Sequence, residues 1–246
     1  MQADRARFAT LHWVRFAEVM TPDRLALSQR PSACLSWKVG PDGPVGPNGY
    51  RLPSNVWCGV ALFADRAAAN AAFDARRAHL PYLDAASESW HALLVPVEHR
   101  GECNHLDRTD PGKLFETGAQ DPGGPLLVLT TAGFNAGATP ARLVDFRIHV
   151  DKVRDWLASI DGNVARQVFT PHTVGDDGAT FSIWRDDAAM ISAMYKPGTH
   201  RTQMDRYKSE KTADRTSFTR FRALRTTGCW NGVDPIAMAS RHGSSH

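Results

Sequence analysis

Two similar stretches lie roughly half the chain apart, and this internal repeat limits the folds that the sequence can adopt. Residues 60–68 and 182–189 each begin with an apolar run that ends in an aromatic residue, followed by a spacer, an aspartate and an alanine-rich run. Asp65 and Asp186 stand where an N-cap belongs, because a carboxylate there accepts the unpaired N–H groups of a helix's first turn. A second shared pattern follows in the same order at residues 89–104 and 217–231. The common order predicts two related halves.

The pattern of apolar residues predicts strands and helices that alternate in the same way in both halves. Strands are expected at residues 8–19 and 126–133, and a helix at 143–160, with Val144, Ile148, Val153 and Trp156 on its buried side. Strands at 164–169 and 180–184 would pair around a Gly/Asp-rich turn. The second half therefore has the β-α-β-β-α-β order of a ferredoxin-like unit. The first half fits the same order if residues 22–29 form its first helix.

Glycine- and proline-rich segments mark the boundaries of these halves. We expect a first ferredoxin-like half at residues 1–117, a second half at 126–232 and a polar tail at 233–246. Residues 118–125 form the linker, and residues 40–53 form a loop too long for a tight turn. The prediction is an α+β protein whose two antiparallel sheets pack or curl into one barrel, with room for a cavity between sheet and helices.

One histidine of the second half is a candidate iron ligand. Pro197 suits the first turn of a helix, and His200, Met204 and Tyr207 then fall at i, i+4 and i+7 on one face. A largely apolar face with a single imidazole is suited to the proximal side of a heme iron. The alternative is a partly buried histidine bonded to a backbone carbonyl, and the spacing alone leaves both interpretations open.

Several short motifs resemble one family of enzymes. In the second half they are residues 180–184, the helix that carries His200, and residues 217–224 followed by Gly228-Cys229-Trp230. In the first half they are residues 35–40 and 56–60. Together they resemble the spheroidene monooxygenase family, the carotenoid 2-ketolases, over residues 8–232. The resemblance implies a dimeric α+β barrel, heme b as cofactor and oxygen-dependent oxidation of an apolar substrate.

The resemblance also implies roles for individual residues. His200 would be the metal ligand, with Arg201, Met204 and Tyr207 also binding the cofactor. On the distal side the candidate catalytic residues are Trp37 and Lys38, with Lys38 or Arg201 also able to pair with a heme propionate. His172 is the next candidate ligand. The sequence departs from the family at Gly40-Pro41-Asp42-Gly43, where ketolases have a Gly-Thr-Gly-like segment, so the substrate is left open and the 40–53 loop is predicted to border the pocket.

Four functions remain open on these grounds. The first is a heme-dependent monooxygenase, which needs dioxygen and an external electron donor such as a ferredoxin or reductase. The second is heme-dependent chemistry at an N–O bond, such as aldoxime dehydration. Aldoxime dehydratases and chlorite-dismutase-like proteins are more distantly similar heme proteins that take a proximal histidine from the second of two fused repeats. The third is a cofactor-free ferredoxin-like monooxygenase, and the fourth is a non-enzymatic heme-binding protein.

Composition and the absence of other motifs exclude several further classes. A net charge of +3, with acidic residues inside the densest basic stretch, gives no footprint for nucleic acid. No zinc-protease, G-x-S-x-G or G-x-G-x-x-G pattern occurs in the sequence. No apolar run is long enough to span a bilayer, and we expect a cytoplasmic protein. Among the other histidines, His12 lies beside Trp13 in a strand where alternation would bury one of the two, and His91 has no partner at a recognisable spacing.

Overall fold

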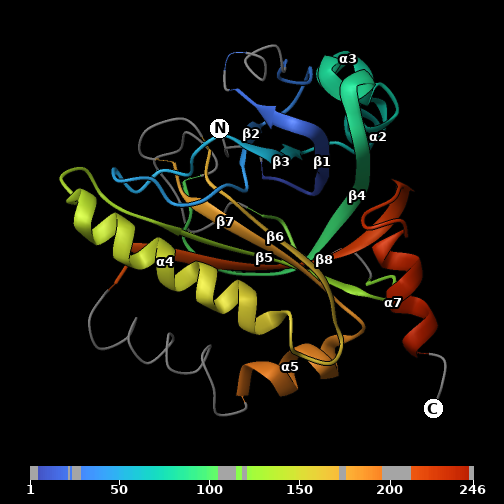
Figure 1. Ribbon diagram of the computed structural model, residues 1–246. Coiled ribbons are helices and arrows are strands. Elements are labelled where there is room, and N and C mark those ends of the chain that lie inside the picture. The colour runs from blue at the N-terminus through green and yellow to red at the C-terminus, as the bar shows by residue number, and fades with distance from the viewer. Residues whose placement is uncertain are drawn as a thin grey trace.

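The computed structural model describes residues 5–21, 23, 29–104, 115–117, 121–171, 176–195 and 212–243. It is an α+β protein, as predicted, built on one antiparallel eight-stranded sheet in the order β2-β3-β1-β4-β8-β5-β7-β6 (Figure 1). The strands are β1 (Phe8–Met20), β2 (Ser36–Pro41), β3 (Ser54–Phe63), β4 (Ala86–Gly101), β5 (Leu126–Gly133), β6 (Asn163–Phe169), β7 (Gly178–Trp184) and β8 (Arg215–Gly228). The helices are α2 (Arg66–Asp74), α3 (Arg76–His79), the 3-10 helix η1 (Pro81–Ala85), α4 (Pro140–Leu157), α5 (Asp187–Tyr195) and α7 (Pro235–Gly243).

The two halves of the chain arrange their strands in the same order. In the first half the order is β2-β3-β1-β4, and in the second it is β6-β7-β5-β8. The last strands of the two halves, β4 and β8, pair with each other in the middle of the sheet. The halves are therefore related by an approximate twofold arrangement about the β4–β8 pair.

The sheet curls so that its edge strands β2 and β6 approach each other. A Cβ atom at Gly40 on β2 would lie 2.2 Å from the Thr170 carbonyl oxygen just beyond β6. Val168 on β6 donates its backbone N–H to Asp42 Oδ2 at 3.3 Å. Only glycine permits the backbone approach at residue 40.

The inner, concave face of the curl is filled by large aromatic side chains. Trp13 and Trp90 lie with ring centroids 5.0 Å apart, and Trp230 packs against Trp13 at 5.6 Å. Phe181 and Phe221 join the same buried cluster from the second half. The interior is thus a packed core shared by both halves, and its burial is the main favourable term for the curl.

Helices cover the outer face of the sheet differently in the two halves. Ala69 and Phe73 of α2 and Leu80 and Tyr82 near η1 pack on the first half. Leu157 at the end of α4 and Met190 of α5 pack on the second. In Figure 1, α2 and α3 lie beside the β1–β4 end, and α4 runs along the β5–β8 side with α5 below it.

Both predicted helix caps are confirmed. Asp65 accepts hydrogen bonds from the backbone of Ala67 and Ala68 at 2.5 and 3.1 Å. Asp186 accepts one from Ala189 at 2.7 Å. The hydrogen bond from the Ala189 backbone holds the pKa of Asp186 below its usual range. The repeated aspartate therefore begins a helix at the corresponding place in each half.

The long helix of the second half is present, and Val153 and Trp156 pack on the core as predicted, but Ile148 does not. It begins at Pro140, after the N-cap Thr139, and Ile148 is 43% exposed. Arg147 is buried instead, because its guanidinium donates to the Gly49 carbonyl and stacks on Tyr50. The helix thus divides its contacts between the sheet and the 40–53 loop, and an apolar pattern cannot reveal the contact with the loop.

The C-terminal segment is also more ordered than the predicted polar tail. Helix α7 occupies most of residues 233–246, and Ala239 is fully buried while Ile236 packs on the inner core. No helix in the described residues is long and apolar enough to cross a membrane. The predicted helix at 22–29 lies largely outside the described residues.

Candidate functional site

Most of the predicted heme-binding residues lie outside the described part of the chain. These are His200, Arg201, Met204 and Tyr207, together with the second candidate ligand His172. Their roles stay predictions. In the described residues, no group of three or more histidine, cysteine, aspartate or glutamate side chains could hold a metal ion. A heme iron needs only one protein ligand, together with a pocket shaped for the ring. The described residues therefore bear on the walls of such a pocket.

Trp37 and Lys38, the predicted distal residues, point to opposite faces of the sheet. Successive side chains of a strand alternate in direction, and both residues belong to the edge strand β2. The Trp37 ring lies on the outer face, where it packs with α2 and η1. Lys38 Nζ pairs with Asp176 Oδ1 at 2.7 Å, and only 13% and 8% of the two side chains are exposed. The two residues therefore cannot line one common pocket of this chain.

The Lys38–Asp176 pair links the edge of the first half to the segment that leads into β7. Both partners are largely buried, so removing either would leave a desolvated charge without its counterion. A heme propionate could recruit Lys38 only by displacing Asp176. The structure thus gives Lys38 a ready structural role, while its predicted catalytic role stays a prediction.

Trp37 borders a buried polar network on the outer face of the first half. His12 Nδ1 and His91 Nδ1 lie 2.9 Å apart, and the outer nitrogens of the two rings contact Thr10 Oγ1 and Ser89 Oγ, each at 3.1 Å. When both rings are neutral, one imidazole donates its Nδ1–H to the Nδ1 of the other, and the accepting ring carries its own proton on Nε2. The Trp37 indole lies edge-on to His12, with ring centroids 6.0 Å apart.

Burial keeps both imidazoles neutral. It lowers the pKa of His91 to about 3, assisted by the nearby positive charges of Arg76 and Arg77. It lowers the pKa of His12 well below its usual value, and His91, Arg76 and His79 add to the effect. The prediction that alternation would bury only one of His12 and Trp13 is wrong, because helices cover the outer face and the aromatic core covers the inner one. The contact between His12 and His91 follows from the register of β1 and β4, which spacing in the sequence does not reveal.

The corresponding place in the second half is open. His12 pairs with Gly59 on β3 and His91 on β4, whereas Thr130 pairs with Thr180 on β7 and Phe218 on β8. His12 is buried, but Thr130 is exposed even though β5 lies in the interior of the sheet, and Thr180 and Phe218 are half-buried. We call Thr130, Thr180 and Phe218 the open patch.

Among the described residues, apolar side chains of α4 pack beside the open patch, and Phe218 contacts the same cluster. Val153 and Leu157 pack on the cluster around Leu126 and Val128, which lies next to Thr130 along β5. Two turns before Val153, Phe146 packs against Phe134 with ring centroids 5.3 Å apart. The small side chains of Thr130 and Thr180, the Phe218 ring and the apolar stripe of α4 together make a surface that suits a flat, largely apolar group.

Comparison with known structures identifies the fold. An aldoxime dehydratase, OxdRE, in complex with butyraldoxime aligns with a TM-score of 0.55 and 11% identity over 96% of this chain and 87% of that chain. A second aldoxime dehydratase aligns at 0.51 with 9% identity, covering 89% and 84% of the two chains. A candidate monooxygenase from Fusobacterium nucleatum is less similar, with a TM-score of 0.40 and 8% identity over 90% and 94%. No family model and no curated protein sequence match this chain.

Proposed function

We propose that this protein is a heme-dependent enzyme that acts on an apolar small molecule, with the heme lying against the outer face of the second half. The observation that carries the proposal is the open patch. Thr130 is exposed there although β5 lies in the interior of the sheet, whereas His12 at the corresponding place in the first half is buried. In this proposal the two halves are fused ferredoxin-like repeats, consistent with their shared strand order.

The residues of the proposed site would have separate roles. Thr130, Thr180 and Phe218 would form the wall against which the flat group lies. His200 would supply the imidazole ligand, with Arg201, Met204 and Tyr207 around it. When bound, heme supplies an iron with one open position for dioxygen or a substrate nitrogen. Trp37 and Lys38 lie in the first half and are not part of the proposed site.

Monooxygenation is the reaction favoured by the sequence resemblance, and it requires an external electron donor. A carotenoid is one candidate substrate. Aldoxime dehydration is the second candidate, and the fold favours it, because two aldoxime dehydratases align with this chain at TM-scores above 0.5. The two reactions differ in their need for dioxygen, which makes them separable by experiment.

The test of the cofactor is an absorption spectrum of protein purified from heme-supplemented cells, compared with His200→Ala and with His149→Ala as a matched control on α4. We expect a Soret band in the wild type that weakens or shifts in His200→Ala and is unchanged in His149→Ala. Absence of the band from the wild type would favour the cofactor-free alternative, and a band insensitive to His200 would move the ligand to His172.

The test of the reaction follows with the heme-loaded protein. Dioxygen consumption that depends on both an electron donor and an apolar substrate would support monooxygenation. Conversion of butyraldoxime to the nitrile by the reduced protein under nitrogen would support dehydration instead. Heme transfer to apo-globin within minutes and no turnover in either assay would indicate a heme carrier.

A further inference from the structure

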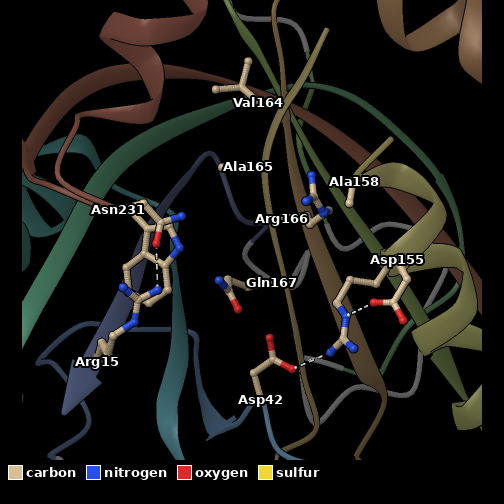
Figure 2. Close-up of a pocket in the computed structure, with 11 residues that line it drawn as sticks. Arg15, Asp42, Asp155, Ala158, Val164, Ala165, Arg166, Gln167 and Asn231 are labelled. Carbon is tan, nitrogen blue, oxygen red and sulfur yellow. Dashed lines mark hydrogen bonds and ion pairs between the residues drawn. The ribbon is translucent and has the colours of Figure 1, made fainter. Parts of the chain in front are cut away.

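A second site lies at the seam of the curled sheet, away from the open patch. A cavity of about 310 Å³ opens where the edge strand β6 faces the end of β1 and the start of the 40–53 loop. Figure 2 shows Arg15 and Asn231 on one side, Asp155 and Ala158 at the α4 end on the other, and Gln167 of β6 between them. Its volume is at the lower end of the range for small-molecule pockets.

The backbone of β6 leaves one row of amide groups facing this cavity. Among the described strands β6 pairs only with β7. The N–H of Val168 points away from β7, toward the seam, where it donates to Asp42 Oδ2. The amides of a strand alternate in direction where the register is regular, so the N–H and C=O groups of Arg166 point to the seam as the N–H of Val168 does. Val164 and Arg166 both line the cavity. A free strand edge of this kind can pair with a ligand that carries an amide.

Two of the three arginines in the cavity already have acidic partners. Arg15 pairs with Glu88 at 2.6 Å and donates to Asn231 at 2.9 Å, and its guanidinium lies 4.3 Å from the centre of the Trp230 ring. Arg154 pairs with Asp42 and Asp155, each at 3.1 Å. These contacts fix the walls of the cavity and neutralise most of its charge.

Arg166 is the remaining positive charge. Within the described residues its guanidinium donates to the amide oxygen of Asn163 at 2.9 Å and forms no ion pair. Partial burial lowers the pKa of Arg166, and the positive charge of Arg154 lowers it further. The cavity lining holds three arginines and two aspartates, and Glu88 beside Arg15 balances the third charge, so among the described residues Arg166 is the lining arginine with no acidic group at ion-pair distance. A half-buried guanidinium without a counterion favours an anionic ligand that can accept two hydrogen bonds.

We propose that the seam cavity binds a small carboxylate ligand that carries an amide close to the carboxylate, as in an N-acyl amino acid. Arg166 holds the carboxylate, and the free edge of β6 pairs with the amide as an added strand would. The site is separate from the open patch, so it stands whether or not the protein binds heme.

The test is calorimetric titration of the purified protein with three matched probes. Hippurate carries both the carboxylate and the amide, hippuramide lacks the charge, and 4-phenylbutyrate lacks the amide. We expect one hippurate site per chain, with hippuramide about 10- to 100-fold weaker because a charged hydrogen bond is lost. 4-Phenylbutyrate should also bind more weakly than hippurate.

The variant Arg166→Gln removes the charge and leaves a shorter, polar amide side chain. It should weaken hippurate binding by at least about tenfold. Arg241→Gln, which removes an exposed arginine of α7, should bind like the wild type. The proposal is overturned if wild-type protein shows no saturable binding of hippurate, if either analogue binds as tightly, or if Arg166→Gln binds hippurate like the wild type. The analogue comparison uses wild-type protein alone, so it decides the matter even if the variant misfolds.

Discussion

The two halves share a strand order but differ at one place on the outer face. In the first half the central position of that face holds His12 and His91, sealed under α2, α3 and η1. In the second half the corresponding position holds Thr130 and Phe218, and Thr130 is exposed. The same scaffold therefore carries a closed polar network in one copy and an open surface in the other.

The two halves therefore use corresponding positions of the outer face differently. In the first half the outer face is packed, and the two imidazoles contact each other while only 4% and 2% exposed. In the second half, within the described residues, Thr130 stays exposed at the equivalent position, while Phe218 is half-buried beneath Arg220. A comparison of matched substitutions at the two places can test whether the open patch is functional.

The largest effect is expected from filling the open patch. Thr130→Trp places an indole where the proposed heme lies, and we expect the Soret absorbance per chain to fall by at least about tenfold, since a site blocked by bulk loses its ligand outright. Val19→Trp adds the same side chain at a strand position that is 61% exposed and should leave the absorbance unchanged. Normal heme content in Thr130→Trp would remove the main support for the proposed site.

The next effect is the response of the first half to acid. The pKa of His91 falls to about 3 on folding and that of His12 is lowered well below 6.5, so the unfolded chain binds protons that the folded chain does not. Stability is complete above about pH 6.5 and falls as the pH drops toward 3, by about 1.4 kcal/mol per pH unit from His91, with a further loss of the same sign from His12. Urea unfolding at a series of pH values measures the slope.

The matched control for this pH response is the double variant His12→Leu/His91→Leu. It removes both titrating groups together and leaves no unpaired ring, so its stability should depend less steeply on pH between 6.5 and 4. An unchanged slope would show that the acid response arises elsewhere in the molecule.

A smaller effect is expected from breaking the histidine pair on one side only. His91→Leu leaves the Nδ1 atom of His12 buried without a partner, which should lower the free energy of unfolding by about 1–3 kcal/mol at pH 8. The corresponding change in the second half, Phe218→Leu, alters a half-buried side chain and should cost less than about 1.5 kcal/mol. Equal losses in the two halves would contradict the contrast between a sealed and an open face.

Local signals made much of the fold predictable. Strand β5 has the predicted bounds, because Leu126 to Gly133 is an apolar run between turn residues. Asp65 and Asp186 cap helices as predicted, because capping depends on a few neighbouring residues. The burial of Arg147 on α4 was not predictable, because the loop that buries it lies far away in the sequence.

The candidate site was predictable only in part. Strand alternation alone separates Trp37 from Lys38, and this signal was present in the sequence. The pairing of His12 with His91, and of Thr130 with Thr180 and Phe218, depends on registers between distant strands. The exposure of Thr130 depends further on where the helices pack, for which the sequence carries no local signal.

The smallest expected effects test the similarity of the halves instead of their difference. Asp65→Ala and Asp186→Ala each remove an N-cap carboxylate that accepts backbone hydrogen bonds from the first turn of a helix. Each should lower the free energy of unfolding by about 1 kcal/mol, while Glu18→Ala, an exposed acidic residue on β1, should change it by less than about 0.5 kcal/mol. Because the two caps occupy corresponding places after corresponding strands, their losses should agree closely and add in the double variant, since the sites share no partners. A cap that matters in one half and not in the other would mean that the duplicated sequence pattern no longer has the same structural role in both copies.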